Sequence, residues 1–275
     1  MSWRISSKIA RRELRSGLSG FRILIACLAL GVAAIAAVGT VRSGIQAGLV
    51  SEGAALLGGD AEAEFTYRFA TDDEHAWLEN RAEAISQIVD FRSMAVVERD
   101  GVTERGLTQI KAIDEFYPLY GTPKLQSGKA FDTVLQKTGA HPPALMERLL
   151  ADRLALSIGD LFKLGTATFQ LADVITYIPD GAGDGFGLGP RTIVMTKDLG
   201  DSGLLASGTL FSTKYRMKLP NGRNLDTLAS TVETELASSG LRWRDAREAS
   251  PGIAEFVDRL GAFLILVGLA GLAVG

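Results

Sequence analysis

The sequence predicts an α+β domain held outside the cytosol between two transmembrane helices, with two strand–helix–strand units around a middle inserted subdomain. Residues 23–41 are 19 consecutive residues without a charge, and residues 260–275 form a second uncharged apolar stretch. Between them, short apolar segments repeat with period two or with helical spacing, as expected for mixed strands and helices. Hydrophobic residues make up 47% of the 275 residues and charged residues 22%, so a folded core is expected.

Basic residues concentrate ahead of the first apolar stretch. Residues 1–22 carry six Lys or Arg and one Glu, a local charge of +5, which leaves −8 for the remainder of a chain whose net charge is −3. Lys and Arg favour the cytosolic side of a span, so the amino terminus is expected inside and residues 43–258 outside. Within this cytosolic, amphipathic head of residues 1–22, residues 3–17 are predicted to form an amphipathic helix on the inner membrane surface, although a merely solvated basic head remains an alternative. Its expected contacts with anionic lipid headgroups come from Lys8, Arg11, Arg12 and Arg15.

Residues 23–42 are predicted to form the first transmembrane helix. At a rise of about 1.5 Å per residue they nearly cover a hydrocarbon core of roughly 30 Å. A cleaved signal peptide is the alternative, but its apolar region is usually only about 7–15 residues long. Residues 259–275 begin a second span that is cut short, so the chain is expected to be the amino-terminal part of a longer protein. Small residues at helical spacing, common in spans generally, are candidates for close helix packing: Ala29, Ala33, Ala37, Gly271 and Gly275.

The first strand–helix–strand unit follows the first span. Residues 60–67 predict a strand, and a capping box from Thr71 to Glu74 predicts the start of a helix. Residues 88–97 and 103–113 flank a short polar turn and predict a hairpin. The apolar face of the helix is expected to consist of Leu78, Ala82 and Ile85.

The inserted subdomain is expected at about residues 128–205. A pair of prolines at 142–143 precedes an apolar run at 144–156 that we interpret as a helix. Residues 167–177 alternate between apolar and polar side chains and predict a strand, and residues 191–195 predict another.

The second unit contains the clearest strand pattern in the chain, at residues 211–219. One face is largely apolar and the other is basic, and we interpret the basic face as a solvated sheet surface. A turn at 220–222 precedes a helix with Asn224 as its cap. A last strand is expected at 241–246, followed by a helix that returns to the membrane. The basic face consists of Ser212, Lys214, Arg216 and Lys218.

Catalytic and cofactor motifs are missing from the sequence. The two histidines, His75 and His141, have no metal-ligand spacing, so no metal site is expected. The glycine-rich segment 181–190 lacks the strand–helix context of a dinucleotide fingerprint, and we interpret it as a loop. No phosphate-binding Walker motif and no nucleophile elbow occurs, so we expect neither a cofactor nor an enzyme activity. The acidic outer domain also argues against nucleic acid as a partner.

Several short segments recur in the order typical of one membrane-protein family. They are residues 9–14 (IARREL), 31–34 (GVAA), 150–154 (LADRL) and 158–160 (IGD), before a glycine-rich span that begins near Gly261. In this order they resemble the FtsX-like or MacB-like ABC transporter permeases, and among these the branch of permeases associated with lysophospholipase biosynthesis. The likeness extends over the whole chain and depends on order and spacing rather than on one diagnostic motif.

The resemblance implies a multi-pass permease of the bacterial inner membrane with its amino terminus in the cytosol. It implies a separate ABC ATPase subunit as partner, which would bind a cytosolic loop of the permease beyond Gly275. Motion driven by that subunit is expected to reach the outer domain, which would act on lipids, lipoproteins or other envelope partners. Further implied partners are membrane lipid and either a periplasmic protein or a second permease half.

Two other classes of protein remain open from the sequence alone. A two-span membrane receptor with an extracytoplasmic ligand-sensing domain shares the predicted topology. An anchored envelope enzyme or assembly factor shares it too, but no cluster of acid, base and nucleophile is visible.

Overall fold

The computed structural model describes most of the chain between residues 52 and 248. The described ranges are 52–99, 101–136, 139–181, 189–206 and 208–248, with isolated positions on either side at 25, 29, 32–33, 36–37, 39–40, 44, 259, 261–263 and 266.

The chain divides into two compact units, which are described separately. Met1–Leu49 and Pro251–Gly275 form one unit, and Val50–Ser250 forms the other. In the first unit the described positions are helical, including the exposed residues Ala29, Ala33 and Ala37. No helix among the described residues is long and apolar enough to cross a membrane. The expected membrane-surface and second-span positions lie outside the described residues: Lys8, Arg11, Arg12, Arg15, Gly271 and Gly275.

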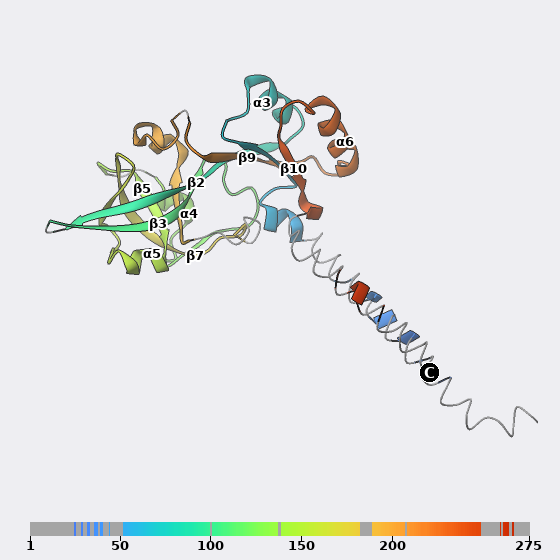
Figure 1. Cartoon of the computed structure of the whole chain (residues 1–275), viewed down its shortest axis with the longest axis horizontal. Helices are drawn as coiled ribbons and strands as arrows, with labels where there is room; N and C mark the ends of the chain where they lie inside the picture. The colour runs from blue at the N-terminus through green and yellow to red at the C-terminus, as the bar shows by residue number, and fades with distance from the viewer. Residues whose placement is uncertain are drawn as a thin grey trace, which may run out of the picture. The chain divides into compact units, whose positions relative to one another are not determined.

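The first two and the last two strands of the unit Val50–Ser250 form a four-stranded antiparallel arrangement, and two helices lie on one face of it (Figure 1). Strand β9 lies between β1 and β2, and β1 lies between β9 and β10, so the segments β1–α3–β2 and β9–α6–β10 interleave. This order is the split βαβ arrangement of ferredoxin-like folds. The elements are β1 (Ala61–Thr66), α3 (Asp72–Glu79), β2 (Ala84–Arg99), β9 (Phe211–Lys218), α6 (Leu225–Glu235) and β10 (Arg242–Asp245).

A second module is a closed ring of six strands. The neighbours run β2–β3–β8–β5–β7–β6, and β6 pairs back onto β2, so the ring has no free edge of its own. Its interior is apolar and includes Phe162, Phe169 and Leu171. The added strands are β3 (Val102–Ile113), β5 (Pro143–Glu147), β6 (Leu161–Leu164), β7 (Ala167–Tyr177) and β8 (Arg191–Met195). The short elements are β4 (Lys124–Leu125), α4 (Phe131–Val134), α5 (Arg148–Arg153), η1 (Thr196–Ser202) and η2 (Ala246–Glu248).

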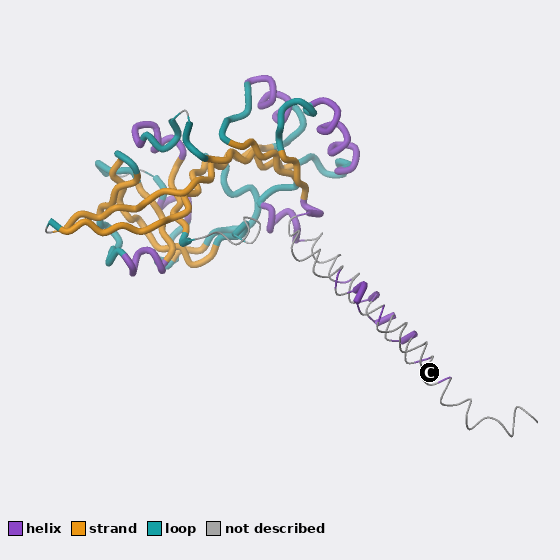
Figure 2. The backbone as a smooth tube through the Cα atoms, in the orientation of Figure 1, coloured by secondary structure: helices purple, strands orange, loops and turns teal. Residues whose placement is uncertain are grey.

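Strand β2 belongs to both modules. Its first half, Ala84 to Phe91, pairs with β9, whereas Ile88 to Arg99 pairs with β3. The continuous orange tube in Figure 2 shows this run of strand from one module into the other. The segment at about 128–205 therefore completes its ring with β2 and β3 rather than with its own strands alone.

Several predicted elements are confirmed in place. The strands at 60–67, 167–177, 191–195, 211–219 and 241–246 correspond to β1, β7, β8, β9 and β10, and the hairpin corresponds to β2 and β3. The side chain of Asn224 caps α6 by accepting hydrogen bonds from the backbone N–H groups of Asp226 and Thr227 at 2.9 and 3.2 Å.

Two predicted helices are wrong in extent or kind. Helix α3 ends at Glu79, and Ile85, expected on its apolar face, lies in β2 opposite Met217. The run 144–156 is not one helix, because Ala144, Leu145 and Met146 belong to β5 and only Arg148–Arg153 is helical. All three residues are fully buried, and a short continuous apolar run fits a central strand as well as a buried helix.

The predicted capping box of α3 is confirmed and is reinforced from outside the helix. The Thr71 Oγ1 atom accepts from the Glu74 N–H at 3.3 Å, and Glu74 Oε2 accepts from the Thr71 N–H at 2.8 Å. The Arg68 guanidinium donates to both oxygens of Glu74 at 2.6 and 2.8 Å. These bonds from Arg68, assisted by Thr71, lower the pKa of Glu74 from 4.5 to about 2.

Removal of this carboxylate is expected to weaken the unit and to change its response to acid. Glu74→Gln should lower the free energy of unfolding of a Val50–Ser250 chain by about 1–2 kcal/mol at neutral pH. Because the pKa is lowered on folding, the contribution is complete above about pH 4.5 and is lost as the pH falls toward 2. Urea unfolding at several pH values measures both effects. The exposed Glu79→Gln should change stability by less than about 0.5 kcal/mol, and an equal effect of the two substitutions would contradict the assignment.

Candidate functional site

Charged side chains gather on the face of the sheet opposite α3 and α6. Side chains alternate along each strand, so the register decides which of them meet. Glu62 of β1 lies opposite Arg216 of β9 on one side and Arg244 of β10 on the other. Asp90 of β2 lies opposite Lys111 of β3 on the same face. Strand pairing therefore brings residues from five strands into one polar layer.

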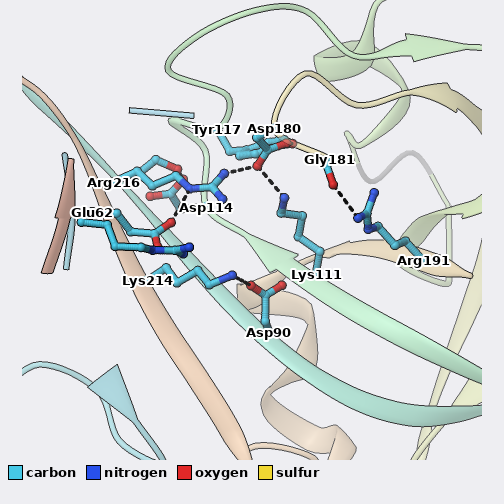
Figure 3. Close-up of polar contacts among 12 residues, drawn as sticks. Glu62, Asp90, Lys111, Asp114, Tyr117, Asp180, Gly181, Arg191, Lys214 and Arg216 are labelled. Carbon is cyan, nitrogen blue, oxygen red and sulfur yellow. Dashed lines mark hydrogen bonds and ion pairs between the residues drawn. The ribbon is translucent and has the colours of Figure 1, made fainter. Parts of the chain in front are cut away.

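Arg216 occupies the centre of this layer. Its Nε atom lies 3.0 Å from Glu62 Oε2, and its guanidinium also pairs with the carboxylate of Asp180. Arg244 bonds the other oxygen of Glu62. Figure 3 shows Arg216 with its contacts to the carboxylates of Glu62 and Asp180. Arg216 is 1% exposed, Asp180 1% and Glu62 0%, so these charges are held out of water.

Asp180 gathers donors from three directions. Lys111 Nζ lies 2.5 Å from its Oδ2 atom, and the Tyr117 hydroxyl donates to its Oδ1 atom at 2.7 Å. Both partners are buried, and Arg216 is the third. Asp180 lies three residues after the end of β7, so one carboxylate ties the residues that follow β7 to β3 and β9. We call the set Glu62, Lys111, Tyr117, Asp180, Arg216 and Arg244 the buried ionic network.

A further ion pair lies beside the network. Lys214 Nζ is 2.7 Å from Asp90 Oδ2, and both side chains are almost completely buried. Burial alone would raise the pKa of Glu62, but Arg216, Lys214 and Arg244 outweigh it and hold that pKa below its usual value. Glu62 is therefore an ionised carboxylate that depends on its cations.

The turn after the helical residues 52–57 rests directly on the network. Gly58 has φ +78°, and a Cβ atom added there would lie 2.6 Å from Arg216 Nη1 and 3.1 Å from Asp180 Cβ. Only glycine combines that backbone conformation with so close an approach. Two residues on, Asp60 accepts hydrogen bonds from the Tyr120 hydroxyl at 2.8 Å and from the Leu219 N–H at 2.7 Å.

The beginning and the end of the unit Val50–Ser250 lie against each other. A Cβ atom on Gly53 would lie 2.0 Å from the backbone oxygen of Ala246. The Ala246 N–H also donates to the backbone carbonyl oxygen of Asp60 at 2.9 Å. The first described helical residues of this unit therefore lie in contact with its last described residues.

The interpretation of the basic face of residues 211–219 as a solvated surface is wrong. Lys214 and Arg216 are buried and ion-paired, and only Lys218 is exposed. The acidic residues of β1, on the strand that pairs with β9, are the signal that could have suggested this. The sequence patterns did not identify Glu62, Lys111 or Asp180 as members of a site.

The network holds charge in place and carries no reactive group. Its carboxylates accept bonds from Arg and Lys, and its one hydroxyl, that of Tyr117, donates to Asp180. His75 lies edge-on to Tyr215 with ring centroids 5.4 Å apart, and its Nδ1 atom is 3.4 Å from Glu79. Within the described ranges, no three His, Cys, Asp or Glu side chains are grouped to hold a metal.

The described part of Val50–Ser250 is thus a mixed α/β unit with a buried ionic network on one face of its sheet. The chain belongs to the family of the MacB-like periplasmic core domain, whose model matches residues 23–235. The resemblance to MacB-like permeases noted in the sequence is therefore confirmed.

One curated relative is also an ABC transporter permease. The chain is 26% identical over 262 residues to the uncharacterized ABC transporter permease YbbP of Escherichia coli K12. That match covers 94% of this chain and 30% of the relative, so the chain spans about a third of the relative's length.

Two solved structures are similar in fold at low identity. One is the periplasmic region of MacB from Actinobacillus actinomycetemcomitans, with TM-score 0.43 and 12% identity, covering 69% of this chain and 90% of that one. The other is the extracellular domain of the noncanonic ABC-type transporter YknZ from Gram-positive bacteria, with TM-score 0.43 and 12% identity, covering 67% of this chain and 98% of that one. At these TM-scores neither structure bears on the details of the site.

Loss of the central cation is expected to destabilise the unit strongly. Arg216→Met should lower the free energy of unfolding of a Val50–Ser250 chain by about 3–5 kcal/mol, because it leaves two buried carboxylates short of a cation. Denaturant unfolding monitored by tryptophan fluorescence measures the change. Lys218→Met on the same strand should change it by less than about 0.5 kcal/mol, because its ion pair with Glu83 is exposed. Similar values for the two variants would show that the buried pairs are energetically unimportant.

Proposed function

We propose that the chain is the amino-terminal part of the permease subunit of an ABC transporter in the bacterial inner membrane. A separate ATPase subunit on the cytosolic side would supply the energy, so the chain itself is not proposed to be an enzyme. The family assignment supports a permease over the two-span receptor. The observation that carries the mechanism is the contact between the turn at Gly58 and the buried ionic network.

The proposed topology places the amino terminus in the cytosol and residues 43–258 in the periplasm, between spans at 23–42 and 259–275. The basic head supports this orientation, because Lys and Arg near a span favour the cytosolic side. The meeting of Gly53 and Ala246 supports it as well, since both flanks can then leave the domain toward one membrane surface. Within the periplasmic part, the inserted subdomain would be the ring of strands that residues 128–205 complete with β2 and β3.

The proposed mechanism is mechanical. Movement of the first span would pass through residues 52–57 to the turn at Gly58, and from there to Arg216 and Asp180. Separating buried charges would leave them uncompensated at a cost of several kcal/mol, so the network favours movement of its strands as one body. Because β2 continues from the sheet into the six-stranded ring, the ring would move with them. The moving domain would act on lipids, lipoproteins or other envelope partners.

The topology can be tested with reporter fusions. Alkaline phosphatase inserted at Gly128, an exposed glycine with no atom within 4 Å of an added Cβ, should be active, because the enzyme requires the periplasm. Green fluorescent protein at the amino terminus should fluoresce in the same cells. An inactive phosphatase together with a protease-accessible amino terminus would reverse the orientation.

The coupling role can be tested with two glycine substitutions in the full-length protein. Purification in mild detergent should recover an ATPase subunit, and Gly58→Ala should reduce ATP hydrolysis by that complex severalfold, because the new methyl group meets Arg216. Gly101→Ala is the matched control, since its φ is +81° but nothing lies within 4 Å of the added Cβ. Consistent absence of an ATPase would contradict the permease assignment. Equal activities of the two variants would contradict only the coupling path.

A further inference from the structure

An open groove crosses the charged face of the sheet next to the buried ionic network. Its cavity of about 510 Å³ lies over β1, β9, β2 and β3. The Lys214–Asp90 ion pair forms part of its lining, together with the polar side chains of Ser212 and Gln109. We call this feature the β9 groove.

Exposed apolar side chains mark one side of the β9 groove. Tyr67 is 61% exposed and Leu210 is 72% exposed, and both line the cavity. Phe69 nearby packs on Phe211, with ring centroids 5.2 Å apart. Large apolar side chains that remain in water beside a concave surface are typical of protein interaction sites, where Tyr is enriched among the residues that dominate binding.

The backbone at Tyr67 is held in an unfavourable conformation that leaves the ring in solvent. Its φ is +60°, in the left-handed region that non-glycine residues rarely adopt. The Tyr67 N–H donates to the Phe211 oxygen at 2.7 Å, which anchors this conformation to the first residue of β9. Strain of this kind clusters at functional sites, and here it does not bury the side chain.

Two opposite charges stand on either side of β9 in the groove. Glu64 lies on β1 and Arg92 on β2, and the structure assigns neither of them an ion pair with another described residue. The cation and anion beneath them, Lys214 and Asp90, already pair with each other. Among the described residues, the edges of the groove therefore offer one carboxylate and one guanidinium without an ion pair, on strands that lie on either side of β9.

We propose that the β9 groove is the docking site for a segment of another envelope protein, one that carries an apolar side chain between a basic and an acidic residue. The apolar side chain would pack on Tyr67 and Leu210, the basic residue would meet Glu64, and the acidic residue would meet Arg92. This rests on the proposed function, because it requires the groove to face the periplasm. It adds where a partner binds and what chemistry that partner presents.

The lining of the groove favours a protein over the other occupants. An acyl chain would cover Ser212, Gln109 and the Lys214–Asp90 pair without replacing their contacts with water, which is unfavourable. A second copy of this chain, related by a two-fold axis through the groove, would bring one concave groove against another and leave a void between them. A peptide segment with both kinds of side chain would pack its apolar group on Tyr67 and Leu210 and would offer hydrogen-bonding groups to the polar part of the lining.

The groove is also connected to the path proposed for coupling. Glu64 lies opposite Lys214, and two residues along the same strands Glu62 lies opposite Arg216. Asp90 lies opposite Lys111, which pairs with Asp180. A partner seated in the groove would thus be two residues along β1 and β9 from the contact between Arg216 and Gly58.

Site-specific photocrosslinking in intact cells tests the docking site. The full-length protein would carry p-benzoylphenylalanine in place of Tyr67 or of Leu210. The control position is Leu149 on α5, whose exposed fraction of 61% equals that of Tyr67. Irradiation should give the same protein adduct at the first two positions and not at the third. Arg92→Glu should reduce that adduct by roughly fivefold, as expected for reversal of a rim charge. Arg105→Glu, on an exposed residue of β3, should leave it unchanged.

Each other result would overturn the proposal. Adducts with lipid alone, or with a second copy of this chain, would identify a different occupant. A protein adduct that Arg92→Glu does not reduce, or that Leu149 gives equally, would show that the contact does not depend on the groove. If no adduct forms while the phosphatase at Gly128 is active and the ATPase copurifies, the docking site alone is wrong and the permease assignment stands.

Discussion

The structure depends on one buried cation, Arg216, placed between the carboxylates of Glu62 and Asp180. Each of these charges would be strongly unfavourable alone inside the protein, and each is tolerated because the other two are in place. Arg216 is 154 residues from Glu62 and 36 residues from Asp180 along the chain. The three side chains can therefore meet only when the sheet and the segment after β7 are both formed and the turn at Gly58 is in place. The network therefore makes the arrangement of these elements specific as well as stable.

The long strand β2 gives this local constraint a longer reach. One half of β2 pairs with β9, which carries Arg216, and the other half is part of the six-stranded ring. The two halves overlap at Ile88 to Phe91, where β2 has a neighbour on each side, so one continuous strand connects the sheet with the ring. Such a construction suits a permease domain that moves as a body, which is the role proposed here for this member of the MacB-like family.

The β9 groove uses the same sheet face for a different purpose. Where the face is covered by Asp180, Tyr117 and the turn at Gly58, its charges are paired and buried. Where it is left uncovered, Glu64 and Arg92 have no ion pair with another residue that the structure describes, and Tyr67 remains in solvent. The buried ionic network and the β9 groove thus lie side by side on four strands. In the proposed mechanism, a partner bound in the groove would affect the network through these shared strands.

Patterns among neighbouring residues were enough to predict the local elements: the capping box at Thr71, the cap at Asn224, the hairpin of β2 and β3, and the alternation of β9. The sequence also carried the resemblance to the permease family. The folded chain was needed to show that 143–147 is a strand, since a short apolar run is compatible with both helix and strand, and that Arg216 and Lys214 are buried. Alternation shows that two faces differ, but whether the basic face meets water or Glu62 and Asp180 is settled by residues 154 and 36 positions away in the chain.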